Sequence, residues 1–297
     1  MAGAAQPQAQ KEQRRPERRG IKKGLYLIPS AFTAANLSMG FYAVMAALRG
    51  FQLLNSANAA DLQHAAEFFD NAAKAICWAV LFDVLDGRIA RMTNTTTEIG
   101  VQFDSIADVL TFGIAPAVLA YAWGYGSALT EGRWAHKLGW FLSFMYLMCG
   151  AFRLARYNVQ AARPRILAEG TARVDKKNFI GLPIPPAAAL IAAIIHFAPK
   201  PLLQYQLRYA VLYSGLMMAL VGCLGALMVS TIRYTSFKTV GTSSRSTRLA
   251  ILLIAAIGML IYLFSDYALL VLVTAYVLHG LIIRMWALFR RRGTQEA

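Results

Sequence analysis

Four aspartates occupy one short stretch of the chain. They are Asp83, Asp86, Asp104 and Asp108, and they represent four of the fifteen acidic residues in a sequence of 297. The runs around them are apolar enough to lie in a membrane, where an unpaired carboxylate is costly. The sequence therefore predicts that these carboxylates share a partner or perform a chemical step.

The spacing of the aspartates predicts two helix faces, each with a pair of carboxylates and small residues beside them. Positions i, i+3, i+4 and i+7 share one face of a helix. The first face has this spacing at Asp83, Asp86, Gly87 and Ala90. The second face steps by four residues, at Gly100, Asp104 and Asp108.

Such a cluster requires a cation, because several carboxylates cannot all stay ionised in a low-dielectric pocket without one. Only Arg88 and Arg91 lie near in sequence, and two guanidinium groups would leave an excess of negative charge. All-oxygen ligands suit Mg²⁺ or Mn²⁺, and the absence of a nearby histidine in the sequence argues against zinc. A metal, carboxylates and an arginine indicate phosphoryl transfer, although Arg91 could also be an arginine at a helix end that extends to the membrane surface.

The elements that must position these residues are membrane helices. Hydrophobic residues make up 57% of the chain and charged residues 15%, against about 25% charged in soluble domains. The charges fall in short polar islands between long apolar runs. We therefore predict an all-α, polytopic transmembrane helical bundle of about eight spans, near residues 25–48, 71–90, 101–123, 138–157, 187–198, 209–229, 249–264 and 267–288.

The formal net charge of +15 is explained by this topology. Nucleic-acid binding is the usual inference for a basic soluble protein, but here the Lys and Arg residues gather in alternate loops and in both tails. The positive-inside rule then places both termini in the cytoplasm. All four aspartates fall at one depth near the cytoplasmic face, and we expect no nucleic acid as a partner.

The same pattern divides the chain into five segments. We expect a basic cytoplasmic N-tail, a catalytic transmembrane core, a basic cytoplasmic loop, two additional helices and a basic C-tail. Their boundaries are 1–24, 25–230, 231–248, 249–288 and 289–297.

The aspartate stretch resembles the signature of the CDP-alcohol phosphatidyltransferases, with every fixed position and gap kept. It reads Asp83-x2-Asp86-Gly87-x2-Ala90-Arg91-x8-Gly100-x3-Asp104-x3-Asp108. The resemblance implies a six-helix core, a homodimer, and displacement of CMP from a CDP-linked lipid by an alcohol. It also implies that Asp83, Asp86, Asp104 and Asp108 bind a divalent metal and that Asp108 is the general base. The implied CDP-binding residues are Gly87, Ala90, Arg91 and Gly100, to which we add Asn36 in the first span.

Further segments are similar to the bacterial and archaeal phosphatidylserine synthases, a branch of this family. They lie at residues 36–40, 152–158, 181–186 and 230–238. This similarity implies CDP-diacylglycerol and L-serine as substrates, and a multi-pass protein of the cell (inner) membrane with its active site facing the cytoplasm. Candidates for contact with the serine carboxylate or the lipid phosphate are Arg153, Arg156, Asn158, Arg233 and Lys238.

Two alternatives remain open at this point. The acceptor alcohol could be glycerol 3-phosphate, inositol phosphate or choline, since the chain has enough cationic groups for a phosphorylated acceptor. Intramembrane aspartates also mark ion pathways in cation-coupled transporters. Transporters often have internal repeats and place carboxylates at mid-membrane, whereas this sequence has no evident repeat and carries its aspartates near one face.

Overall fold

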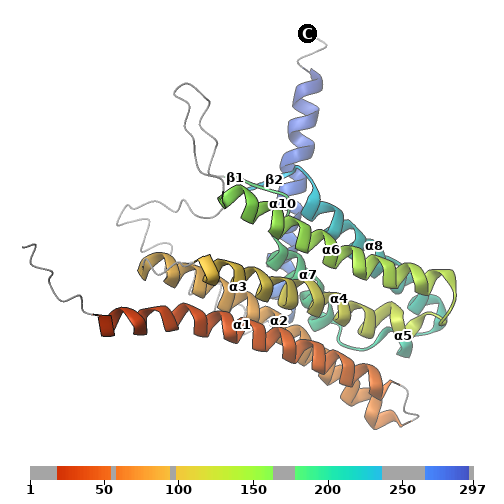
Figure 1. Cartoon of the computed structure of the whole chain (residues 1–297). Helices are drawn as coiled ribbons and strands as arrows, with labels where there is room; N and C mark the ends of the chain where they lie inside the picture. Colours follow the sequence, from red (N-terminus) through yellow and green to blue (C-terminus); the bar gives the residue numbers. More distant parts are fainter. Residues whose placement is uncertain (1–18, 55–57, 94–97, 163–177, 236–264, 294–297) are drawn as a thin grey trace, which may run out of the picture.

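The computed structural model describes residues 19–54, 58–93, 98–162, 178–235 and 265–293, and these residues form mainly helices (Figure 1). The elements are, in chain order, α1 (Arg19–Leu53), α2 (Ala59–Thr93), α3 (Glu98–Asp108), η1 (Val109–Ile114), α4 (Ala115–Ala120), η2 (Tyr121–Tyr125), α5 (Gly126–Ala128), α6 (Trp134–Ala162), β1 (Asn178–Ile180), α7 (Ile184–Phe197), η3 (Leu202–Gln204), α8 (Leu207–Val229), β2 (Arg233–Thr235) and α10 (Ser265–Gly293). The predicted all-α bundle is confirmed.

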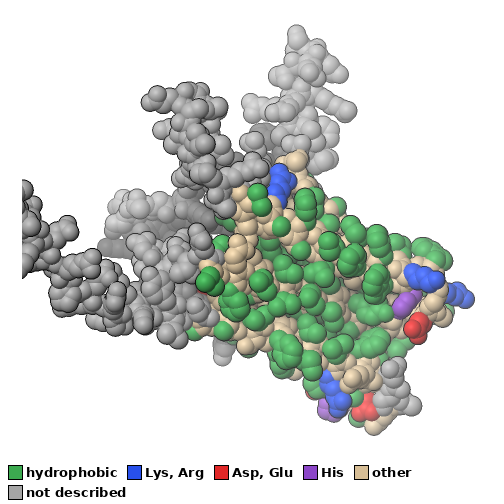
Figure 2. Space-filling view, in the orientation of Figure 1, with side chains coloured by type: hydrophobic (Ala, Val, Ile, Leu, Met, Phe, Trp, Pro, Cys, Tyr) green, Lys and Arg blue, Asp and Glu red, His purple; other side chains and the backbone are tan. Residues whose placement is uncertain are grey.

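Within the described residues, five helical segments are long and apolar enough to cross a membrane. They are Ala31–Leu53, Ile99–Ala128, Trp134–Val159, Ile184–Gln204 and Leu207–Val229. Figure 2 shows hydrophobic side chains over most of one face, with charged side chains near the edges of that face. An apolar surface of this extent suits lipid contact, and the protein is a multi-pass membrane protein. The count of eight spans stays a prediction, since span 249–264 lies outside the described residues.

The first two helices are longer than the sequence patterns predict. Residues 49–69 are polar enough to suggest a connection, yet α1 continues to Leu53 and α2 begins at Ala59. Asn58 accounts for the new helix start, because its Oδ1 accepts a hydrogen bond from the Ala60 N–H (3.2 Å). The inner face of this extension is apolar, and Phe69 is fully buried. The polar residues therefore occupy the outer face of a continuing helix pair.

Helix α7 lies at the centre of the bundle. Ten of its fourteen residues are buried, and it packs against α2, α4, α8 and α10. Many of the buried residues are alanines, which let neighbouring helix backbones approach closely. In Figure 1, α10 passes behind the bundle and crosses the direction of α1, α6 and α8.

The predicted third span contains two π-helical segments rather than one regular helix. In η1, the backbone N–H of Ala115 donates to the carbonyl of Leu110, five residues earlier. A second segment, η2, includes Gly124 with non-helical angles (φ −109°, ψ −112°). Single π-turns occur often at functional sites, and η1 begins directly after Asp108.

A short antiparallel ribbon joins two polar segments that the sequence analysis considered separately. Strands β1 and β2 pair with Phe179 opposite Tyr234 and Ile180 opposite Arg233. Gly181 follows β1 with φ +82° and donates its N–H to the Ile232 carbonyl (2.8 Å). A Cβ at Gly181 would collide with the carbonyl oxygen of Met228. Both the backbone angle and the lack of space therefore require glycine.

Gly181→Ala is expected to separate the ribbon from the end of α8 and to lower the thermal unfolding midpoint. The matched control is Gly132→Ala, because Gly132 also has a positive φ (+79°) but a Cβ there would meet nothing within 4 Å. The control carries only the backbone strain, about 1 kcal/mol. Equal thermal shifts for the two variants would contradict the steric explanation.

A group of polar side chains joins α2, α7 and α10. Its member on α2 is Asp70, which lies about 20 Å from Asp83 along the helix, given a rise of about 1.5 Å per residue. The His196 side chain is 4% exposed, and its Nδ1 lies 2.5 Å from Asp70 while its Nε2 lies 3.0 Å from Asp266. Ser265 is 3.1 Å from the same Nε2, and Lys74 pairs with Asp70 at 2.6 Å. His196 thus connects two carboxylates that belong to different helices.

His196→Ala is expected to destabilise the protein by about 2 kcal/mol, because it removes a buried side chain that hydrogen-bonds to Asp70 of α2 and contacts Asp266 of α10. His64→Ala is the control, since the His64–Glu67 pair is about 60% exposed on both sides and such pairs contribute about 0–1 kcal/mol. Thermal unfolding in detergent measures both variants. A loss at His64 as large as the loss at His196 would contradict the role of this group of polar side chains.

Candidate active site

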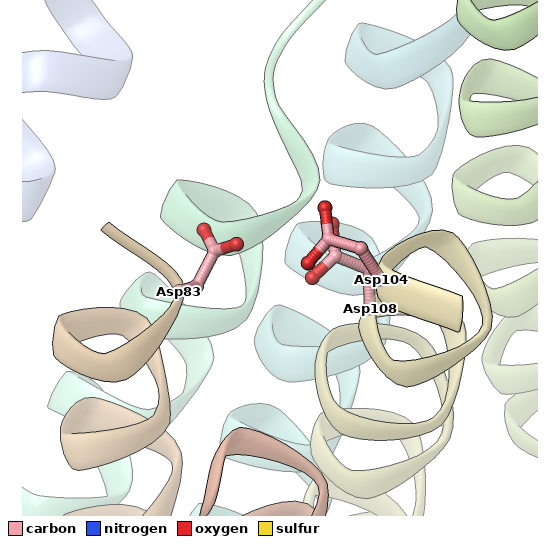
Figure 3. A group of neighbouring side chains, drawn as sticks. All are labelled: Asp83, Asp104 and Asp108. Carbon is pink, nitrogen blue, oxygen red and sulfur yellow. The ribbon is translucent and has the colours of Figure 1, made fainter. Parts of the chain in front are cut away.

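Three of the four aspartates converge at one end of the bundle. One side-chain oxygen from each of Asp83, Asp104 and Asp108 lies within 4.8 Å of the others. Asp83 comes from the last third of α2, and the other two lie one turn apart on α3. Figure 3 shows the three carboxylates directed into the space between the two helices. The helical spacing in the sequence accounts for this arrangement.

Two of the carboxylate oxygens in this group are unusual for buried polar atoms. Among the described residues, Oδ1 of Asp104 and Oδ1 of Asp108 are buried and accept no hydrogen bond. Buried acceptors are costly when unsatisfied, and buried charges are normally paired or bind metals. Three oxygen ligands from carboxylates are the donor set that hard divalent cations prefer. The residues therefore fit a divalent-metal site.

Asp86 lies beside this group but is held differently. It is 4% exposed, and its Oδ2 accepts a hydrogen bond from the Thr33 hydroxyl of α1 (3.1 Å). It remains within electrostatic range of Asp104. The structure thus brings three aspartates together and connects the fourth to α1, so the four-ligand set stays a prediction.

Helix α1 forms one wall of the site through close packing against η1. Asn36 is fully buried and lies beside the Asp108 carboxyl group. The Thr111 hydroxyl donates to the Asn36 backbone carbonyl (3.3 Å), and a Cβ at Gly40 would lie only 2.7 Å from the Thr111 Cα. Asn36 therefore lies both at a contact between helices and beside the group of aspartates, and its role in CDP binding stays a prediction.

The predicted CDP-binding residues lie around the same end of α2 and α3. Gly87 follows Asp86 and is partly buried, and its backbone interacts with the Asp86 carboxylate. Gly100 is exposed in the first turn of α3. Ala90 and Arg91 belong to the last turns of α2, and their side chains lie outside the described set. Their nucleotide contacts stay predictions.

The five acceptor candidates occupy different positions. Arg153 on α6 is partly buried and lies within electrostatic range of Asp108, and its Nε has no hydrogen-bond partner among the described residues. Arg156 is exposed. Asn158 donates from Nδ2 to the Ser105 hydroxyl of α3 (2.8 Å). Arg233 lies on β2 with its side chain outside the described set, and Lys238 lies outside the described residues.

Sequence reasoning missed the supporting contacts of the site. Thr33 and Thr111 were visible only as small polar residues in apolar spans, a pattern that helix packing alone explains. Tyr276 of α10 lies within electrostatic range of Arg153, although about 170 residues separate it from the aspartates. A tyrosine in an apolar helix gives no signal of such a neighbour, because aromatic residues are common there.

Residues 26–221 match the CDP-alcohol phosphatidyltransferase family. The match covers more than half of the chain and includes the helices that carry the aspartates and α1. The chain belongs to this family. Members generally depend on a divalent metal, and the group of Asp83, Asp104 and Asp108 could bind one.

Individual relatives narrow the comparison. The chain is 31% identical over 266 residues to a CDP-diacylglycerol–serine O-phosphatidyltransferase of Helicobacter pylori, covering 87% of this chain and 91% of the relative. It is 34% identical over 171 residues to the enzyme of that name from Saccharomyces cerevisiae, covering 58% and 54%. An archaetidylserine synthase of Methanothermobacter thermautotrophicus is 32% identical over 219 residues, covering 73% of each chain. The names of these relatives refer to two different lipids, and all of them include serine.

Proposed function

We propose that this protein transfers the phosphatidyl group of CDP-diacylglycerol to L-serine, releasing CMP and forming phosphatidylserine. The observation that carries the proposal is the convergence of three carboxylates from α2 and α3 in a membrane bundle. This arrangement suits a divalent cation and a diphosphate near the lipid surface. The names of the relatives support serine as the acceptor.

In this proposal, Asp108 accepts the proton of the serine hydroxyl. The hydroxyl oxygen forms a bond to the phosphorus that carries the diacylglycerol, and the bond from that phosphorus to the bridging oxygen breaks, so that CMP leaves. Burial keeps bulk water from competing with serine for the phosphorus. The neighbouring Asn36 amide borders the Asp108 carboxyl group and limits where it can turn.

The four aspartates together, Asp108 included, are proposed to bind a metal. Asp83, Asp86, Asp104 and Asp108 would hold Mg²⁺ or Mn²⁺, which when bound would neutralise the diphosphate and the developing charge on CMP. Gly87 and Gly100 leave room for the nucleotide to approach the backbone. Ala90, Arg91 and Asn36 complete the proposed CDP site.

Arg153 is the best-supported ligand for the serine carboxylate. A guanidinium binds a carboxylate through two parallel hydrogen bonds, and the Nε of Arg153 has no partner among the described residues. Its position near Asp108 would hold serine beside the proposed base. Arg156, Arg233 and Lys238 are further candidates for lipid phosphate, and Asn158 joins α6 to α3.

The proposed orientation of the protein in the membrane is based on the distribution of its Lys and Arg residues. The Lys and Arg residues of both tails and of the loops after α6 and α8 favour a cytoplasmic location for the active site in the cell (inner) membrane. The proposed organisation is a catalytic core over residues 25–230 with two further helices over 249–288. We also propose a homodimer, which the family resemblance favours.

Purified protein with CDP-diacylglycerol tests the function. Separate reactions would contain serine, glycerol 3-phosphate, inositol phosphate or choline, with Mg²⁺, Mn²⁺ or EDTA. We expect CMP release with serine and a metal, and none with EDTA. Preferential CMP release with another alcohol would refute the serine assignment, and metal-independent release would refute the metal site.

A further inference from the structure

One face of α1 contacts the two elements next to the aspartates. Thr33, Asn36 and Gly40 are three and four residues apart, so they share this face, and all three are buried. The Thr33 hydroxyl donates to Asp86 of α2 (3.1 Å). The Asn36 carbonyl and the Gly40 backbone both meet Thr111 of η1. These contacts fix the position of α1 relative to α2 and η1.

The Thr33 contact differs from the other two because it reaches a proposed metal ligand directly. Asp86 lies three residues after Asp83 on α2, and hence on the same face of that helix. Asp86 is 4% exposed and Thr33 is 7% exposed. A hydrogen bond in such a low-dielectric place is stronger than one in water. The orientation of Asp86 therefore depends on a residue 53 positions earlier in the chain.

A hydroxyl donor suits a carboxylate that also binds a cation. It carries no charge, so the carboxylate keeps the negative charge that an arginine or lysine partner would offset. A carboxylate has about four lone-pair sites, so one bond from Thr33 leaves acceptor capacity for a metal ion. Loss of a hydrogen bond that orients a metal ligand typically lowers metal affinity about 10- to 100-fold. A hydroxyl between membrane helices can also serve packing alone, and metal affinity distinguishes the two roles.

We propose that Thr33 is a positioning residue for Asp86, and that α1 thereby sets the affinity of the aspartates for a divalent cation. The inference rests on the metal dependence in the proposed function. The Thr33 hydroxyl holds Asp86 in one orientation before a cation binds, so that binding does not have to order this side chain. The other three aspartates already lie close together. Asp86 is then the fourth ligand, oriented by a residue outside the aspartate signature.

Thr33→Val removes the hydroxyl and keeps the shape of the side chain. We expect the Mn²⁺ dissociation constant of the purified protein, measured by EPR without substrates, to rise about tenfold. Thr33→Ser retains the hydroxyl and should stay within about threefold of wild type. Ser214→Ala is the control for loss of a buried hydroxyl, because Ser214 of α8 is fully buried and its Oγ has no hydrogen-bond partner among the described residues. The Ser214 variant should bind Mn²⁺ as tightly as wild type.

Two further measurements separate positioning from a structural role. The kcat for CMP release by Thr33→Val should return to near the wild-type value when the Mn²⁺ concentration is raised about tenfold, because only the metal affinity has changed. In an Asp86→Ala background, which retains the other three aspartates, adding Thr33→Val should change the Mn²⁺ dissociation constant less than about twofold, because Thr33 acts through Asp86. If Thr33→Val does not fold, Thr33→Ala replaces it, since alanine also lacks the hydroxyl and is smaller.

The outcomes distinguish this inference from the proposed function. A wild-type protein that binds no Mn²⁺ and releases CMP in EDTA would refute the metal site of the proposed function. If wild type binds Mn²⁺ and Thr33→Val binds it equally well, the inference alone is wrong. An equal loss of affinity in Thr33→Val and Thr33→Ser would also overturn it, since that result marks packing rather than the hydroxyl as the cause.

Discussion

Asp108→Asn is expected to lower CMP release about a thousandfold, which lies within the usual contribution of a general base. Asparagine has the same shape as aspartate but cannot take the proton of the serine hydroxyl. The fold should persist, because the change removes one of several carboxylates that repel each other at close range. Steady-state CMP release, assayed with a divalent metal, measures the loss of activity. Thermal unfolding, followed in EDTA, measures the effect on the fold, and the unfolding midpoint should stay the same or rise.

Asp61→Asn is the matched control for this variant. Asp61 lies in the first turn of the same helix that carries Asp83, far from the carboxylate group. It should retain near-normal CMP release. Near-normal release by Asp108→Asn would refute the assignment of the base, whereas loss of activity in both variants would point to a general effect of charge.

Gly40→Ala should lower CMP release about a hundredfold, although Gly40 touches none of the proposed substrates. A Cβ there would collide with Oγ1 of Thr111 and lie 2.7 Å from its Cα. Because the second atom is backbone, α1 and η1 must move apart, which costs about 1–3 kcal/mol for an overpacked core. The shift would displace Asn36 and Thr33 from Asp108 and Asp86, and misplacement by about 1 Å can cost a hundredfold in rate.

Gly215→Ala provides the comparison for Gly40. Gly215 is also a helical glycine, on α8, but a Cβ there would meet nothing within 4 Å. Alanine in a helix is about 1 kcal/mol better than glycine, so this variant should be active and at least as stable as wild type. Normal activity in Gly40→Ala would show that the contact between α1 and η1 is adjustable and would contradict this explanation.

The convergence of Asp83, Asp104 and Asp108 could be predicted from sequence because it depends on two regular features. Helical spacing puts the carboxylates of each pair on one face, and the short connection between α2 and α3 brings the faces to one level. The membrane character followed from composition for a similar reason, since a lipid environment imposes long apolar helices. Both are local patterns with a strong physical constraint.

The remaining contacts depend on pairs of residues that are distant in sequence. Strands β1 and β2 have three residues each and lie more than fifty residues apart, too short for any strand pattern to emerge. The junction of Asp70, His196 and Asp266 joins three helices. The different environment of Asp86 depends on Thr33, 53 positions earlier. Such pairings are decided by tertiary packing, which periodicity within one segment does not describe.

The π-helical turn η1 sets the angular relation between the two halves of its span. An extra residue in a helical turn rotates everything before it by about 100° relative to everything after it, given 3.6 residues per turn. Asp104 and Asp108 precede η1, while the buried residues of α4 follow it. Deleting a single residue from Val109–Ile114 would join α3 to α4 as a regular α-helix and leave the span almost as hydrophobic as before. It would also turn both carboxylates away from Asp83, so the site depends on the residue count of this span as well as on the identity of its aspartates.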